Sequence, residues 1–208
     1  MVKPLRDGIL QLADDPFQML EQWLEEAKVA GAAEPTAMTL ATASKDAVPS
    51  ARIVLFKGTS KSSQGRQAVE FFTNYQSHKS DDLSENPRAA LVFHWNLLRR
   101  QLRIEGEVEK VSAEESNAYF QSRARESQIG AWSSPQSQYL KDREELVARV
   151  EATKARFGTG VISCPPFWGG WRLTPSRFEF WEERAARLHE RHEMKFENGL
   201  WVKRRLAP

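Results

Sequence analysis

The stretch Gln101-Leu-Arg-Ile-Glu-Gly-Glu-Val-Glu109 decides the fold class of this sequence. Its apolar residues Leu102, Ile104 and Val108 alternate with charged residues. This period of two is typical of a strand with one face buried and the other in solvent. Further strands are predicted on both sides of it.

These further strands are rich in β-branched and apolar residues, which favour pleated structure. They cover Met38 to Ala43, Ser50 to Lys57, Ala68 to Thr73, Ala89 to Trp95, Gly169 to Leu173, Phe178 to Glu182, His192 to Phe196 and Leu200 to Arg204. The pair Asn198-Gly199 indicates a tight hairpin between the last two strands.

Helical segments interrupt the strands. The first is well marked, because Asp15 can cap it and Pro16 fits its first turn. The predicted segments are Asp15 to Gly31, a short turn over Leu83 to Pro87, Ser112 to about Gln121, and a stretch from Leu140 to about Gly158, while Gly58 to Gln67 is expected to be an exposed loop. Runs of strands with few helices favour an α+β fold with an antiparallel sheet or barrel. We expect one domain over residues 1–208, with residues 1–14 as a short N-terminal arm.

Composition excludes several classes of protein. Thirty basic residues nearly balance 28 acidic ones, which argues against the basic field of a non-specific nucleic-acid binder. No apolar run approaches the roughly 20 residues that span a bilayer. The lone Cys164 has no disulfide partner, and nothing near Met1 resembles a signal segment, so a cytoplasmic protein is expected.

Familiar catalytic motifs are absent from the sequence. There is no glycine-rich phosphate loop and no nucleophile elbow, and Cys164 has no evident catalytic partner. His189 and His192 have a spacing that suits two metal ligands on a helix, but on a strand they point to opposite faces. With no third ligand nearby, no metal site is expected.

Three clusters of cationic side chains remain as candidate anion sites. Arg52 and Lys57 bracket an apolar run, and their odd spacing on a strand predicts that they face different anions. Tyr119, Arg123 and Ser127 recur every four residues, so on one helix they suit a phosphate, although a solvated helix face explains the spacing too. The third cluster is the stretch from Trp181 to Arg191, which suits a flat anionic ring or is a basic surface loop.

Through these three clusters, in their order along the chain, the sequence resembles the pyridoxine/pyridoxamine 5′-phosphate oxidase family. This family folds as an FMN-binding split β-barrel with peripheral helices. The segments that carry the resemblance are Arg52-Ile-Val-Leu-Phe-Lys57, Phe71-Phe-Thr-Asn74, Ser127-Gln-Ile-Gly-Ala-Trp132, Phe167-Trp-Gly-Gly170, Phe180-Trp181, Arg187-Leu-His189 and Arg205-Leu-Ala-Pro208. Together they span nearly the whole chain, from about Asp15 to Pro208.

The resemblance implies two sets of site residues. FMN contacts are expected from Arg52, Ile53, Val54, Leu55, Phe56, Lys57, Phe72, Thr73, His78, Lys79, Gln101, Gln136, Ser137, Trp181 and Arg191. The family draws these contacts from two subunits, so a homodimer is implied. The substrate set is Lys57, Tyr119, Arg123 and Ser127 at the phosphate, with Arg187, Leu188 and His189 at the pyridine ring. Of these, Arg187 and His189 are the expected catalytic residues, which orient the ring and assist proton movement.

The implied reaction oxidises pyridoxine 5′-phosphate or pyridoxamine 5′-phosphate to pyridoxal 5′-phosphate on FMN, with oxygen as the final acceptor and hydrogen peroxide as the by-product. Three features depart from the family pattern: His78 stands where arginine is more frequent, Phe72 stands where tyrosine is common, and the N-terminal arm is short. The alternatives are a split-barrel flavin oxidase of the phenazine-pathway type and a non-enzymatic anion-binding module. None of these interpretations involves a membrane.

Overall fold

An antiparallel sheet carries the fold in the computed structural model, which describes residues 10–208. The strands are β1 (Ala37–Ala43), β2 (Pro49–Leu55), β3 (Thr59–Lys61), β4 (Gln67–Asn74), β5 (Arg88–Trp95), β6 (Arg100–Lys110), β7 (Trp168–Glu182), β8 (Glu190–Glu197) and β9 (Leu200–Leu206). Their order is β2-β1-β5-β6-β7-β4-β3, with β8 paired to β7 and β9 paired to β8. The predicted α+β class with an antiparallel sheet is therefore confirmed.

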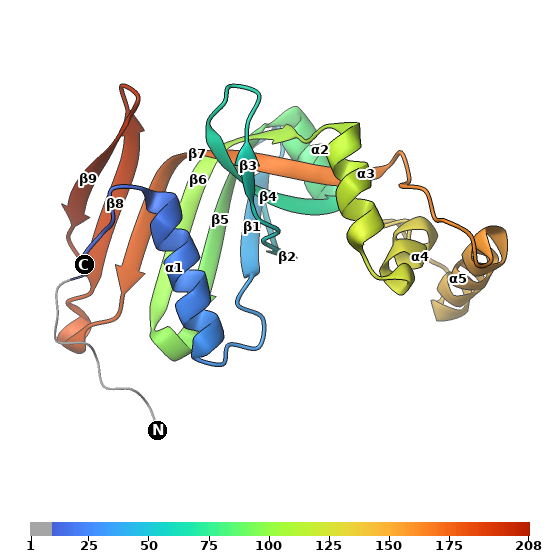
Figure 1. Cartoon of the computed structure of the whole chain (residues 1–208), viewed down its shortest axis with the longest axis horizontal. Helices are drawn as coiled ribbons and strands as arrows, with labels where there is room; N and C mark the ends of the chain where they lie inside the picture. The colour runs from blue at the N-terminus through green and yellow to red at the C-terminus, as the bar shows by residue number, and fades with distance from the viewer. Residues whose placement is uncertain (1–9) are drawn as a thin grey trace.

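The helices lie in two places around this sheet. They are α1 (Pro16–Val29), α2 (His78–Glu85), α3 (Ala113–Ser122), α4 (Arg125–Ser133) and α5 (Arg143–Phe157). Figure 1 shows α1 across one face of the sheet, with α3, α4 and α5 gathered at the end far from the β8–β9 hairpin. None of the helices in residues 10–208 is long and apolar enough to cross a membrane.

The main core lies between α1 and the inner face of the sheet. The alternation along β6 is confirmed, because Leu102 and Ile104 are completely buried and Val108 is nearly so. Trp23 of α1 meets the Phe180 ring edge-on at 5.2 Å, an arrangement that aromatic pairs prefer. The cap at Asp15 also forms as predicted, since its Oδ1 accepts a hydrogen bond from the Phe17 amide at 3.0 Å.

A second, smaller core holds the helices at the far end of the sheet. It consists of buried Phe120, Ile129, Ile162 and Trp168, with Phe72 and Tyr119 packed against them. These residues come from α3, α4, β4 and the segment that enters β7. The second core thus fixes α3 and α4 against the start of β7.

β7 differs from the prediction, because the two strands expected within it are one strand of 15 residues. The strand contains Pro175, which donates no hydrogen bond to a sheet. This proline is tolerated here because β6 shifts register between Glu105 and Gly106, and Gly106 lies opposite Pro175. A Cβ on Gly106 would lie 2.1 Å from the Thr174 carbonyl oxygen, so the close approach requires glycine.

Three predictions of local structure need correction. α2 begins at His78, five residues before the expected turn at Leu83, and α4 was not predicted. The expected loop from Gly58 to Gln67 contains the short strand β3. The expected N-terminal arm lies mostly outside the described residues.

Candidate functional site

A cavity of about 660 Å³ opens where β2, β4, α2, α3 and α4 meet, and we call it the β2–α4 cavity. The predicted site residues that line it are Ile53, Val54, Leu55, Lys57, Phe72, Thr73, Lys79, Tyr119, Arg123, Ser127 and Gln136. The charged residues of its lining are Lys57, Lys79 and Arg123, and no aspartate or glutamate is among the lining residues. Three cations without a carboxylate favour an anionic ligand.

The cluster of Tyr119, Arg123 and Ser127 converges in this cavity by a different geometry from the one expected. α3 ends at Ser122, Arg123 and Ala124 are extended, and α4 begins at the next residue. No side chain caps α4, because its N-cap is Ala124. Ala124 and Ser127 line the cavity, so the uncapped start of α4 adds amide donors and a positive dipole end to it.

Arg123 is the least satisfied cation of the cavity. Its Nη1 atom is buried and has no hydrogen-bond partner among the described residues. Burial lowers the pKa of Arg123, because no full charge compensates the lost hydration. Its guanidinium carbon lies 4.6 Å from the centre of the Trp168 ring. A buried donor without a partner indicates a missing acceptor, and a phosphate oxygen fits that role.

Lys79, in the first turn of α2, lines the same cavity. Its Nζ atom donates to Thr73 Oγ1 at 3.1 Å, Ser77 Oγ at 2.9 Å and Gln136 Oε1 at 2.9 Å. All three acceptors are neutral. Burial and the charge of Arg52 lower the pKa of Lys79 to about 8. An anion beside this amine would restore its charged form.

Arg52 and His78 lie beside Lys79 but outside the lining of the cavity. Arg52 Nη2 lies 3.8 Å from Asp82 Oδ2, and His78 Nδ1 lies 3.6 Å from the same oxygen. Asp82 is buried and accepts a hydrogen bond from Thr42 Oγ1 at 2.6 Å. Asp82 therefore anchors both Arg52 and His78 at the first turn of α2.

Three other predicted site residues of this region have distinct positions. Lys57 lines the cavity and Arg52 does not, and Lys57 lies two residues beyond the end of β2. Phe56 packs against the main core, with its ring centre 6.1 Å from that of Phe93. Ser137 follows Gln136 in a left-handed conformation with φ of 67°.

The remaining predicted site residues form a second group, which we call the strand-end group. It lies on β6, β7 and β8 and in the turn that joins β7 to β8: Gln101, Trp181, Arg187, Leu188, His189 and Arg191. Gln101 pairs with Trp181 across β6 and β7, and Trp181 pairs with Arg191 across β7 and β8. None of the group lines the β2–α4 cavity. Within one chain, the predicted site is therefore in two parts.

His189 and Arg187 belong to the turn that joins β7 to β8. The His189 ring centre is 4.6 Å from that of Trp181, and its Nδ1 atom accepts a hydrogen bond from the Arg184 amide at 3.2 Å. The neutral ring therefore carries its proton on Nε2. Ala186 and Arg187 have φ of 54° and 61°, which is the left-handed conformation. This conformation is strained for any residue other than glycine, and such strain is frequent at functional sites. Leu188 is 67% exposed.

Arg191 is fixed on two sides. Its Nε and Nη2 atoms lie 2.9 Å and 2.8 Å from Glu179 Oε1, and its Nη1 atom donates to the Ala207 carbonyl at 2.9 Å. Glu179 is 2% exposed and also pairs with Arg103 and Arg177. The buried carboxylate thus holds the Arg191 side chain in one orientation.

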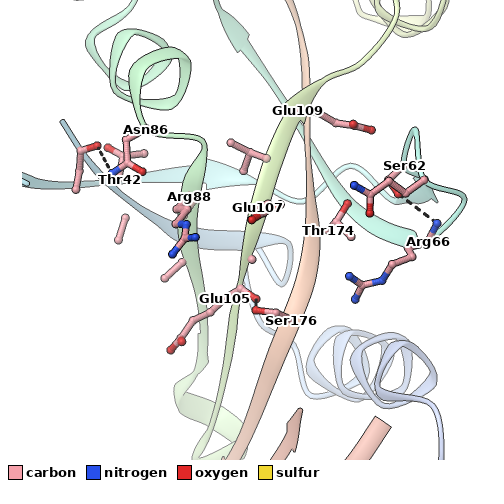
Figure 2. A pocket seen from close by; sticks show the side chains of 17 residues that line it. Thr42, Ser62, Arg66, Asn86, Arg88, Glu105, Glu107, Glu109, Thr174 and Ser176 are labelled. Atoms are coloured by element: carbon pink, nitrogen blue, oxygen red, sulfur yellow. Dashed lines mark hydrogen bonds between the residues drawn. The ribbon is translucent and has the colours of Figure 1, made fainter. Parts of the chain in front are cut away.

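A larger cavity of about 800 Å³ lies over β5 and β6 and contains none of the predicted site residues. Figure 2 shows its charged lining, which consists of Glu105, Glu107, Glu109, Arg66 and Arg88. The Arg66 guanidinium is already engaged by the Pro175 carbonyl. Carboxylates outnumber guanidiniums here, so this cavity lacks the anion-binding character of the β2–α4 cavity.

Several residues of the β2–α4 cavity were not predicted from the sequence: Asn74, Ala124, Gly130, Ala131, Ser134 and Trp168. Trp168 lies in the segment Phe167-Trp-Gly-Gly170, whose glycines were a usable signal. A Cβ on Gly170 would lie 2.8 Å from the Phe72 ring, so glycine lets that ring reach the wall of the cavity. Within residues 10–208, no three His, Cys, Asp or Glu side chains gather in a way that could hold a metal ion.

Two family models match the chain. Residues 24–157 match the model described as pyridoxamine 5′-phosphate oxidase. Residues 168–208 match the model described as the C-terminal dimerisation region of pyridoxine 5′-phosphate oxidase. The second match covers β7, β8 and β9, and it includes every residue of the strand-end group except Gln101.

Curated relatives resemble the chain over nearly its full length. The chain is 48% identical to the pyridoxine/pyridoxamine 5′-phosphate oxidase of Pseudomonas putida, with 98% of this chain and 94% of the relative covered. It is 46% identical to the enzyme of the same name from Zymomonas mobilis, with 95% of this chain and all of the relative covered.

Solved structures agree on the fold. The PhzG protein of Burkholderia lata, in complex with tetrahydrophenazine-1-carboxylic acid, superposes with a TM-score of 0.88 at 30% identity, covering 97% of this chain and 98% of that one. An FMN-binding protein of Nostoc punctiforme, described as related to pyridoxamine 5′-phosphate oxidase, superposes with a TM-score of 0.74 at 17% identity, covering 95% and 99%. The predicted split-barrel fold is thereby confirmed.

Proposed function

The chain belongs to the pyridoxine/pyridoxamine 5′-phosphate oxidase family, and we propose that the β2–α4 cavity binds the substrate phosphate through Arg123, Lys57, Tyr119 and Ser127. The reaction is the oxidation of pyridoxine 5′-phosphate or pyridoxamine 5′-phosphate to pyridoxal 5′-phosphate, with oxygen reduced to hydrogen peroxide. The observation that carries the binding proposal is the buried, unpartnered Nη1 atom of Arg123.

The first turn of α2 fits the phosphate of FMN. Lys79, Arg52 and His78 lie together there, and Lys79 is bonded only to neutral oxygens. Arg52 and His78 are already oriented by Asp82, so little side-chain freedom is lost when an anion binds. Thr73 and Gln136 would complete this phosphate site, and the backbone from Ile53 to Leu55 offers an edge for the flavin ring.

The strand-end group would complete the site from a second copy of the chain. Gln101, Trp181 and Arg191 present an aromatic face and a fixed cation, which suit a flat anionic ring. They lie outside the β2–α4 cavity of their own chain, and β7, β8 and β9 match the dimerisation region. A homodimer that brings this group of one chain to the cavity of the other joins both halves of the site.

FMN supplies the two-electron acceptor of the reaction, and the chain supplies orientation. The cations at the start of α2 hold one phosphate and Arg123 holds the other. Two clamps on two aromatic molecules fix the distance and angle between their rings, which lowers the entropy cost of reaching a reactive geometry. Arg187 and Leu188 would face the pyridine ring, and His189 would take up or release a proton at Nε2.

A phenazine-type oxidase is the second candidate, because the PhzG protein shares this fold at 30% identity. Its structure was solved with a carboxylic acid that has no phosphate group. The chain is more similar to the curated phosphate-substrate enzymes, at 46 to 48% identity. The three cations of the cavity also exceed what a single carboxylate needs.

Anaerobic addition of pyridoxine 5′-phosphate to the FMN-loaded protein tests the proposal, since the expected reaction bleaches the flavin absorbance. Bleaching by a tetrahydrophenazine carboxylate alone would favour the second candidate. Protein that takes up no FMN would indicate a non-enzymatic anion-binding module.

The Arg123→Ala variant tests the division of the two phosphate sites. Its KM for pyridoxine 5′-phosphate should rise about 10- to 100-fold, as expected for the loss of a charged hydrogen bond, while the Kd for FMN stays constant. Arg125→Ala is the matched control, because Arg125 binds the carbonyls of Gly158 and Gly160 and does not line the cavity. Equal losses of FMN and substrate affinity in Arg123→Ala would reject the division.

A further inference from the structure

Trp168 is the aromatic neighbour that faces the Arg123 guanidinium most closely. The guanidinium carbon lies 4.6 Å from the centre of the Trp168 ring and 5.8 Å from that of Phe120. The Arg123 side chain forms no ion pair and no hydrogen bond with any of the described residues. An indole face attracts a cation through its quadrupole, and tryptophan does so better than phenylalanine.

The Trp168 ring is itself held in place by a stack of rings. It is parallel to the Tyr119 ring, with an interplanar angle of 4° and a centre-to-centre distance of 6.2 Å. The Phe72 ring is stacked on Tyr119 at 3.9 Å and lies 5.6 Å from Trp168. Trp168 is 7% exposed, and the Phe120 ring packs against it edge-on at 5.2 Å. The indole therefore has little freedom to tilt.

We infer that Trp168 is a positioning residue: its ring face holds Arg123 in the orientation that binds the substrate phosphate. The inference rests on the proposed function of Arg123 and extends it to Trp168, whose ring face contacts the Arg123 guanidinium. A carboxylate in this place would neutralise Arg123 and compete with the phosphate. The indole orients the cation and leaves its positive charge available, which suits a reversible phosphate site.

The test uses the FMN-loaded protein and compares Trp168→Phe with the wild type. The weaker quadrupole of phenylalanine should raise KM for pyridoxine 5′-phosphate about three- to tenfold, with kcat and the Kd for FMN nearly unchanged. The affinity for pyridoxal 5′-phosphate should fall by the same factor. The affinity for pyridoxal, which lacks the phosphate, should not change.

A double-mutant cycle separates positioning from packing. In the Arg123→Ala background, Trp168→Phe should raise KM no further, because the cation that it orients is gone. Trp132→Phe is the matched control, since Arg156 lies 4.5 Å from the Trp132 ring centre and neither residue lines the cavity. This control should leave KM unchanged.

Site-specific incorporation of fluorinated tryptophans at position 168 covers the case in which Trp168→Phe does not fold. Fluorine weakens the ring quadrupole and nearly preserves the shape, so KM should rise with each added fluorine. The inference is overturned if KM does not follow fluorination, if Trp168→Phe acts equally with and without Arg123, or if pyridoxal binding falls as much as pyridoxal 5′-phosphate binding. If the wild-type protein does not oxidise pyridoxine 5′-phosphate at all, the proposed function itself is refuted.

Discussion

Affinity for FMN should fall as the pH rises through the pKa of Lys79. Burial first, and the neighbouring Arg52 charge second, lower this pKa to about 8 in the unliganded chain. A bound phosphate dianion favours the ammonium form and raises the pKa again. Because the ligand binds the protonated form better, the affinity is full below the pKa of the free protein. It is lost progressively above that pKa.

The expected size of the effect follows from this pKa. About nine-tenths of the Lys79 amines are protonated at about pH 7 and about one-tenth at about pH 9, so the Kd for FMN should rise about tenfold across this range. The phosphate monoester does not contribute, because its second pKa is about 6 and it remains a dianion throughout. The effect corresponds to about 1.4 kcal/mol of binding free energy.

Quenching of FMN fluorescence by the apoprotein, in buffers without phosphate, measures this dependence. Lys79→Arg keeps the positive charge at all of these pH values and should make the Kd nearly independent of pH. Lys79→Gln should bind weakly at every pH, whereas His78→Gln, which leaves Lys79 in place, should keep the wild-type slope. A constant Kd in the wild type, or the same slope in Lys79→Arg, would refute the role of Lys79.

Two further substitutions test how the site is supported. Glu179→Gln should weaken FMN binding by about 3- to 30-fold, because it frees the Arg191 side chain. Glu105→Gln is the control, since it removes a carboxylate from the same ion-pair network that does not contact Arg191, and it should leave FMN affinity unchanged. Fluorescence titration measures both variants, and equal losses of affinity would mean that Glu179 only stabilises the fold. Gly170→Ala should destabilise the fold by about 1–3 kcal/mol, because the new Cβ would lie 2.7 Å from the Val111 side chain and 2.8 Å from the Phe72 ring. Gly130→Ala is the control, since a Cβ there has no atom within 4 Å, and it should leave the free energy of unfolding unchanged. Urea denaturation measures both variants.

The sequence predicted those parts of the fold whose signals are local. The alternation along β6 and the cap at Asp15 each depend on a few neighbouring residues, and both formed as expected. The continuity of β7 was missed because the device that accommodates Pro175 lies on another strand, at Gly106. α4 was missed because Ala124 precedes it in place of a capping side chain.

For the site, the residue types were more predictive than the assumed geometry. Tyr119, Arg123 and Ser127 reach one cavity although a helix break separates them, so the spacing argument was wrong and the expected convergence was right. The role of Trp168 could not be inferred from the sequence, because it depends on a ring orientation that β7 and α3 create together.

The unpaired charges of the β2–α4 cavity link ligand selection to stability. Lys57, Lys79 and Arg123 share a lining without a carboxylate, so their charges repel one another and the rest of the fold must offset this repulsion. A ligand that binds only the folded state stabilises it, and here each bound phosphate also removes part of the repulsion. A neutral analogue such as pyridoxine fills the same space but leaves the cations unpaired. The same charges that make the unliganded chain less stable therefore make it selective for phosphorylated molecules.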